Sequence, residues 1–151
     1  MRANIKTRTW AWASLAILGL ATPVMANAAQ VDVMACDVQV TYSLNNVPSL
    51  SYAMSFQVAP DAPFSDDFST ATRFRFFDAT MTVEDGVPVV SIVFDADVSV
   101  FNTVDFGASL KVRDRNKGET TSGNNSFFSS LPGVAGAHRT EYTLSCQRAK
   151  L

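Results

Sequence analysis

Residues 72–113 have the sequence TRFRFFDATMTVEDGVPVVSIVFDADVSVFNTVDFGASLKVR, in which apolar and polar residues largely alternate. This alternation is typical of strands with one buried face, because successive side chains of a strand point to opposite faces. Asp85 and Gly86 divide the stretch and suit the two positive φ angles of a type I′ hairpin turn. The sequence therefore predicts a hairpin that closes Glu84 against Val87.

Pairing outward from this turn places apolar side chains together on one face. The expected partners are Met81 with Val90, Ala79 with Ile92, and Phe77 with Phe94. The alternation changes phase at Phe76 and Phe77, which predicts a β-bulge, because one inserted residue resets the phase. The bulge would turn Phe74 inward, near Ala96. It would also form two surface ion pairs, each worth about 0–1 kcal/mol, between Arg75 and Asp95 and between Arg73 and Asp97.

A third strand is expected after a short turn at residues 101–103. Its apolar residues recur at every second position from Val104 to Val112. They share a face with the apolar residues of the preceding strand if Val100 pairs with Val104. The three strands then form a sheet with one apolar face, which needs a second layer or must close on itself.

Other parts of the chain show the same alternation. Residues 33–44 and 50–58 form a predicted hairpin that brings Tyr42 near Tyr52, and another strand is expected at residues 140–147. Residues 29–151 contain no amphipathic helical pattern of useful length. The sequence therefore predicts an all-β fold, an antiparallel β-sandwich or small β-barrel of about six to eight strands.

Residues 1–28 have the parts of a secretory signal peptide: a basic start, an apolar core at 10–20, and the small-x-small motif Ala26-Asn27-Ala28. An uncleaved membrane anchor is the alternative, but the apolar core is shorter than the roughly 20 residues of a membrane span. We therefore expect cleavage, no transmembrane segment afterwards, and a single periplasmic or secreted domain at 29–151.

Cleavage would also change the charge of the protein. It removes three basic residues and no acidic ones, so the net charge falls from −2 to about −5. This charge disfavours a nucleic-acid-binding protein, which usually carries a basic surface.

The two cysteines are Cys36 and Cys146. In an exported protein a lone pair of cysteines predicts a disulfide. This bridge would join the first and last strands and close about 110 residues, which contributes roughly 4 kcal/mol in a chain-entropy model. The spacing does not match a CxxC redox motif, and one histidine cannot complete a zinc site with these cysteines.

Residues 60–71 form a predicted connection with one short helical turn after Ser65. Acidic residues suit the N-terminus of a helix, and Phe64 and Phe68 would cover an open end of the core. A calcium site is the alternative, although no ordered ligand spacing is present. The carboxylates in question are Asp61, Asp66 and Asp67.

Catalysis has few candidate residues in this chain. His138 is the only histidine, so a Ser-His-Asp or Cys-His site would have to use it. It lies where a Gly-containing loop meets a predicted strand, and we expect an ordinary loop histidine. Asp95 and Asp97 could serve a glycosidase, but the predicted pairing with arginines explains them better. We therefore expect neither an enzyme nor a bound cofactor or metal.

Two groups of residues are candidate surface contacts. Lys111, Arg113, Arg115 and Lys117 form a basic stripe that could meet an acidic partner, although such stripes are usually only solvated. Residues 115–125 are expected to form a mobile loop or a loosely paired hairpin end. Phe127 and Phe128 cannot both face inward on a regular strand, so we expect a bulged edge strand, the alternative being an exposed contact. The candidate contacts are Phe64, Phe68, Phe127, Lys111, Arg113 and Arg115.

These expectations describe an exported binding or inhibitory module for a protein or glycan of the cell envelope or the extracellular space. A structural or assembly subunit that pairs through an unprotected edge strand is the alternative. A hydrolase is a third interpretation, which rests only on acidic residues. An aromatic cleft near Phe64, Phe68 and Phe127 would favour binding, and an accessible edge strand would favour assembly.

Overall fold

The computed structural model describes residues 32–149, which form eight β-strands and no helix that could span a membrane. The predicted signal peptide at 1–28 lies outside these residues. The strands are β1 (Met34–Leu44), β2 (Val47–Val58), β3 (Phe64–Asp67), β4 (Arg75–Glu84), β5 (Val87–Ser99), β6 (Asn102–Lys111), β7 (Glu119–Ser129) and β8 (Gly136–Arg148).

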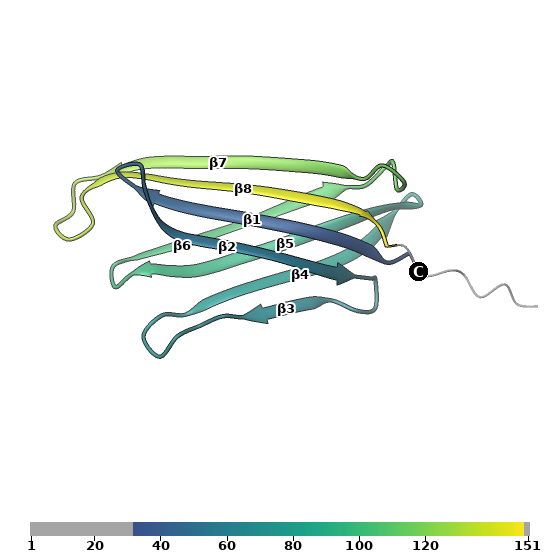
Figure 1. The fold of residues 1–151 in the computed structure, drawn as a ribbon, viewed down its shortest axis with the longest axis horizontal. Coiled ribbons are helices and arrows are strands. Elements are labelled where there is room, and N and C mark those ends of the chain that lie inside the picture. The colour runs from purple at the N-terminus through teal and green to yellow at the C-terminus, as the bar shows by residue number, and fades with distance from the viewer. Residues whose placement is uncertain (1–31, 150–151) are drawn as a thin grey trace, which may run out of the picture.

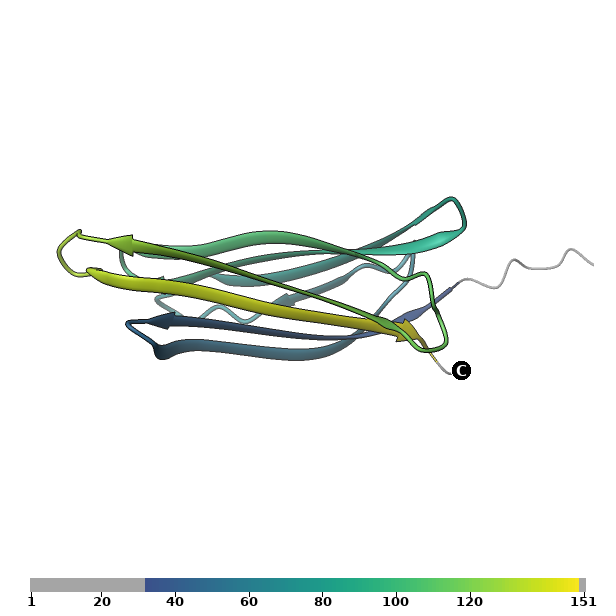
Figure 2. The same cartoon turned by 90° about the horizontal axis from the view of Figure 1, so that it is seen from above.

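The strands form two antiparallel sheets of four, in the orders β2-β1-β8-β7 and β3-β4-β5-β6. The sheets lie over one another as a long two-layer sandwich (Figures 1 and 2). The second sheet pairs strands that are neighbours in sequence, whereas the first joins an early and a late hairpin through β1 and β8. The predicted all-β fold is confirmed, and it is a sandwich rather than a closed barrel.

The predicted central hairpin is present. Asp85 and Gly86 have φ angles of 51° and 76°, and Glu84 pairs with Val87. The three apolar pairs expected on the inner face, Met81–Val90, Ala79–Ile92 and Phe77–Phe94, form in that register.

The bulge predicted at Phe76 and Phe77 is wrong. The β4–β5 ladder runs regularly through this point, with Arg75 opposite Ala96 and Phe76 opposite Asp95. Phe74 is therefore not inward but 53% exposed, and its ring centroid lies 6.3 Å from that of Phe76. The regular ladder keeps its backbone hydrogen bonds, and the two outward rings partly shield each other. The expected ion pairs of Arg73 and Arg75 with the aspartates do not form.

An irregularity occurs instead near the end of β5. The register shifts between Asp97 and Ser99, and the turn consists of Val100 and Phe101. Val104 pairs with Ala96 rather than with Val100, so the predicted pairing is wrong by four residues. Because four is an even number, the side chains keep their faces, and Val104 remains in the core.

The β1–β2 hairpin also has a tighter turn than expected. Asn45 and Asn46 have φ angles of 54° and 62° and connect the strands by themselves. The register then shifts between Tyr42 and Ser43, so that Tyr52 pairs with Val40 rather than with Tyr42. This shift of two residues again preserves the faces of both strands.

Two segments form regular strands where the sequence predicted a connection with a helical turn (residues 60–71) and a mobile loop or loosely paired hairpin end (residues 115–125). The chain forms β3 from Phe64 to Asp67 instead of a helical turn, and residues 119–125 belong to β7. β7 is an edge strand, as predicted, but its register with β8 is regular at Phe127 and Phe128. The expected bulge is therefore absent, and these two rings point to opposite faces of the sheet.

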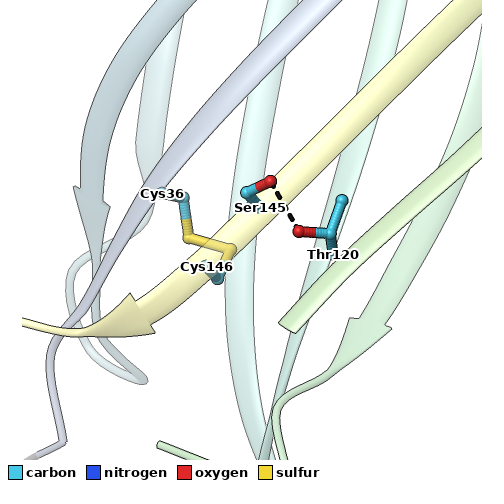
Figure 3. The surroundings of a disulfide bond; sticks show 4 residues. All are labelled: Cys36, Thr120, Ser145 and Cys146. Atoms are coloured by element: carbon cyan, nitrogen blue, oxygen red, sulfur yellow. Dashed lines mark hydrogen bonds between the residues drawn. A yellow bond between two sulfur atoms is a disulfide. The ribbon is translucent and has the colours of Figure 1, made fainter. Parts of the chain in front are cut away.

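The predicted disulfide joins Cys36 and Cys146. The two residues are direct partners on adjacent strands β1 and β8, with 4.1 Å between their Cα atoms, and both are buried in the core. Figure 3 shows the bridge and, beside it, the 2.8 Å hydrogen bond between the hydroxyl groups of Ser145 and Thr120. The disulfide thus fixes the central strand pair of the first sheet.

A chain of aromatic rings crosses the core from β3 toward β7. Successive ring centroids lie 4.5 to 5.6 Å apart. Contacts at these distances stabilise a core beyond the burial of apolar area alone. The rings, in order, are Phe68, Tyr52, Phe94, Phe106 and Tyr142.

Candidate binding cleft

The two long sides of the sandwich differ, and we name each by an edge strand. The β3 flank carries the edges β2 and β3, and the β7 flank carries the edges β6 and β7. Figure 1 shows β3 and β7 as the outermost strands of their respective sheets. A ligand could enter between the sheets only where a flank is open.

Aromatic side chains cover the β3 flank. Phe64 stacks on Phe56 at 5.1 Å, and Phe68 stacks on Tyr52 at 4.5 Å. The hydroxyl of Tyr52 donates a 3.0 Å hydrogen bond to Asp66. Burial raises the pKa of Tyr52, and the bond to the Asp66 carboxylate raises it further. Phe64 and Phe68 were predicted both as surface contacts and as a cover for an open end of the core. They pack against the core.

The carboxylates of Asp66 and Asp67 in the acidic segment of this flank do not lie together. Asp66 lies opposite Phe77 and faces inward, whereas Asp67 lies opposite Phe76 and faces outward. Hydrogen bonds from the side chain and backbone of Ser69 lower the pKa of the Asp67 carboxyl. Residues 32–149 contain no group of three or more acidic, histidine or cysteine side chains placed to hold a metal ion.

Two of the four residues of the predicted basic stripe form ion pairs. Lys111 lies 3.4 Å from Glu84, and Arg115 lies 2.6 Å from Asp32. Arg115 also donates to the carbonyl of Gly86. These contacts fasten the connection after β6 to neighbouring turns, so the lysine and this arginine have structural partners.

The connection after β6 is ordered by hydrogen bonds rather than loosely paired. A side-chain oxygen of Asp114 accepts from the backbone N–H groups of Asn116 and Lys117, both at 3.1 Å. Glu119 accepts from the backbone N–H of Arg113 at 2.8 Å. The guanidinium of Arg113 extends from an exposed residue, so among the predicted basic contacts it is the one left at the surface.

The β7 flank is open. A cleft of about 290 Å³ lies between the two edge strands, close to the lower limit of about 300 Å³ for small-molecule sites. Its walls come from three strands. They are Thr103, Val104, Asp105 and Phe106 of β6, Gly123, Asn124, Asn125 and Phe127 of β7, and Thr140 and Tyr142 of β8.

The cleft forms where the inner face of the first sheet becomes polar. Asn125 pairs with Thr140, and both alternate in phase with the buried Cys146. At these positions apolar side chains would close the core, whereas an amide and a hydroxyl leave it open to solvent. Polar residues in the inward phase were a visible sign in the sequence, but the assignment of β7 as a loop concealed it.

Gly123 shapes the same wall. A Cβ atom at this position would lie 2.5 Å from Cε1 of Tyr142, closer than real carbon atoms approach. The glycine therefore lets the tyrosine ring lie against β7, where it stacks on Phe106 with 4.9 Å between centroids. The open end of the aromatic chain thus becomes part of the cleft wall.

His138 supports the cleft from behind. It is 2% exposed, and its Nδ1 lies 2.7 Å from the Tyr42 hydroxyl while its Nε2 lies 2.8 Å from the carbonyl of Val134. Since the carbonyl accepts only, Nε2 carries a proton and donates to it. The side-chain amide of Asn102 reaches both Tyr42 and His138, at 3.0 and 3.2 Å. The expectation of a loop histidine is wrong: this residue is buried in β8, and both its ring nitrogens have partners.

The ring of Phe127 stacks on the ring of His138. The two rings are nearly parallel, 7° apart, with 4.4 Å between centroids. Phe127 is nevertheless 51% exposed and borders the cleft. Of the three aromatic residues expected to share a cleft, this one lies in it, and the other two lie on the opposite flank.

Of the two candidate catalytic carboxylates, Asp97 has local hydrogen-bond partners. Asp97 accepts hydrogen bonds from the backbone N–H of Phe74 and from the hydroxyl of Thr103, both at 3.0 Å. These bonds lower the pKa of Asp97, with the bond from Phe74 the larger cause and the charges of Arg73 and Arg75 adding to it. Asp97 therefore fastens the start of β4 to β5 and β6.

No family model matches this chain, and no curated protein is significantly similar to it in sequence. The case for a function therefore depends on the geometry of residues 32–149.

Proposed function

We propose that this protein is an exported binding module that holds part of an envelope or extracellular macromolecule in the cleft on its β7 flank. The open cleft is the observation that carries the proposal. It combines aromatic rings with a few polar side chains, which is the usual make-up of a ligand site. The disulfide between Cys36 and Cys146 supports export, because such bonds persist in oxidising compartments.

The contrast with the other flank supports the choice of surface. Phe64 and Phe68 close the β3 flank, whereas Phe127 keeps half of its surface exposed beside the cleft. An exposed aromatic ring held on a buried partner loses little conformational freedom on binding. A site built in this way binds with a smaller entropic cost than a flexible loop would.

Site-specific photo-crosslinking in intact cells tests the proposal. The crosslinker p-benzoylphenylalanine is placed at Asn125 in the cleft and, as a matched control, at Thr143 on the outer face of β8. We expect adducts from the cleft position that the control position does not give, identified by mass spectrometry. Equal adducts from both positions, or none from the cleft, would contradict the proposal.

Assembly through an edge strand is the second candidate, and the composition of β2 favours it. This edge strand has no charged residue between Val47 and Val58, although charges are a common protection of edges against pairing. β7 forms the other edge of the same sheet. Antiparallel neighbours alternate in direction across β2-β1-β8-β7, so β7 of one copy could pair antiparallel with β2 of the next.

Sedimentation velocity distinguishes this second candidate. Ser51→Lys places a charge on β2, and Thr143→Lys is the control on the central strand β8. If the protein assembles through β2, the wild type should form oligomers whose size depends on concentration. Ser51→Lys should then be monomeric, and Thr143→Lys should still form the oligomers. A monomer at all concentrations would remove assembly and leave the binding proposal unaffected.

A further inference from the structure

The exposed ring of Phe127 is preorganised for stacking. One side of the ring lies on His138 at 4.4 Å, and His138 is fixed at both nitrogens by Tyr42 and the carbonyl of Val134. The exposed half of Phe127 borders the cleft. A flat, apolar ligand surface could therefore pack on a ring that is already held in place.

Neutral hydrogen-bonding groups surround this ring. The amide of Asn125 both donates and accepts, and the hydroxyl of Thr140 does the same; both residues lie in the inward phase of their strands. A ligand that matches them needs hydroxyl or amide groups around its rim. It also needs an apolar face for the aromatic ring.

The charge of the residues that line the cleft further restricts the chemical class of the ligand. Asp105 is the charged residue of the lining, and the lining contains no lysine or arginine. The side chain of Asp105 faces the outer side of β6, because this residue lies between the inward Val104 and Phe106. A phosphate, sulfate or carboxylate would therefore find no cation in the cleft to balance its charge.

We propose that the cleft recognises an uncharged carbohydrate, such as the end or a short segment of a neutral glycan. A pyranose ring has a face of C–H groups that packs on Phe127 and a rim of hydroxyls for Asn125 and Thr140. This inference rests on the proposed function and specifies its ligand class. The volume of about 290 Å³ suits a short stretch of sugar rather than a long groove-bound polymer.

Amide chemical-shift titration of the ¹⁵N-labelled mature protein tests the inference. The probes are neutral oligosaccharides (gluco-, manno-, galacto- and N-acetylglucosamine series), an acidic oligogalacturonate, and a pool of uncharged peptides. We expect the side-chain amide signal of Asn125 to shift with at least one neutral oligosaccharide and not with the acidic one. Phe127→Ala should weaken that binding about tenfold or more, which is about 1.4 kcal/mol.

Phe128→Ala is the matched control, because this neighbouring ring is 75% exposed and lies outside the cleft lining. It should change affinity less than about twofold, well below the tenfold step of 1.4 kcal/mol. Equal losses in the two variants would overturn the inference. Shifts at the cleft with peptides or the acidic sugar alone would overturn the carbohydrate assignment but keep the proposed function. No shift at the cleft with any probe, together with no crosslinked adduct at Asn125, would overturn both.

Discussion

The β3 flank and the β7 flank end the same aromatic chain in opposite ways. On the β3 flank the chain ends under Phe64 and Phe68, with the Tyr52 hydroxyl satisfied by Asp66. On the β7 flank it ends at Tyr142, beside a cleft with polar side chains. A sandwich can thus be closed on one side for stability and open on the other for contact with a ligand.

Removal of the disulfide should have the largest effect, and it should affect both flanks. Cys36→Ala with Cys146→Ala is expected to lower the free energy of unfolding by about 4 kcal/mol, because the bridge closes a long loop. Urea unfolding of the oxidised wild type and the double variant measures this loss. If the amide groups of only one flank lose protection from hydrogen exchange in the double variant, the β1–β8 pair does not stabilise the two flanks equally.

Truncation of one ring on each flank should separate the flanks. Phe64→Ala is expected to cost about 2 kcal/mol, less than for a fully buried phenylalanine. Phe127→Ala should cost less than about 1 kcal/mol, because half of its ring is already exposed. Urea unfolding of both variants makes the comparison. A reversed order would show that the β7 flank contributes the more to stability.

The two buried tyrosine hydroxyls provide a finer comparison. Tyr42→Phe removes the partner at 2.7 Å from the buried His138 and should cost about 1–2 kcal/mol. Tyr52→Phe removes a partly buried bond to Asp66 and should cost about 1 kcal/mol. Thermal and urea unfolding at neutral pH give both values, and equal costs would mean that the histidine network adds no stability of its own.

The Tyr52 bond should also depend on alkaline pH. The folded pKa of Tyr52 is raised above its ordinary value, so its contribution is fully present below about pH 10 and is lost as pH rises through the folded pKa. The stability difference between the wild type and Tyr52→Phe should therefore be constant near neutrality and shrink in strongly alkaline solution. A difference that grows there would contradict the raised pKa.

The smallest effect is expected at Asp97, which is exposed. Its lowered pKa means that its contribution is present above the ordinary aspartate value of about 4 and is lost as pH falls through the folded pKa. Asp97→Asn should be slightly less stable than the wild type at neutral pH and equally stable in strong acid. Denaturant midpoints of both proteins, measured from neutral pH to strong acid, test this expectation. A stability difference that stays constant with pH would exclude the charge of Asp97 as its cause.

Local patterns made much of the fold predictable. The turn at Asp85-Gly86 can be predicted from this dipeptide and the residues that flank it, and both the predicted turn and the predicted strand pairing were right. Asn45-Asn46 offers the same type of turn, because asparagine tolerates positive φ, but it was merged into a longer loop. The registers that were wrong in the β1–β2 and β5–β6 hairpins differed by even numbers of residues, so their apolar faces were still right, whereas the predicted bulge shifted the register by one residue and put Phe74 on the wrong face.

Competition between aromatic residues was not predictable in the same way. The bulge at Phe76 and Phe77 was inferred from the change of phase there and was expected to turn Phe74 inward, whereas the structure places Phe74 and Phe76 outside and keeps the ladder regular. The hydrogen-bond network of His138 behind the cleft was missed for a different reason. The partners of His138 lie 96 and 36 residues away in the sequence, at Tyr42 and Asn102, and only the folded chain brings them together.

The pairing of β1 with β8 also sets an order of assembly. The β3–β6 sheet can grow from hairpins between neighbours in sequence, while β1 must keep one edge free until a strand 110 residues later arrives. Such distant contacts form slowly, because closing a long loop costs entropy before any contact repays it. Oxidation of Cys36 and Cys146 brings the pair into the bridge between β1 and β8, so it reports chains in which the centre of the first sheet has come together.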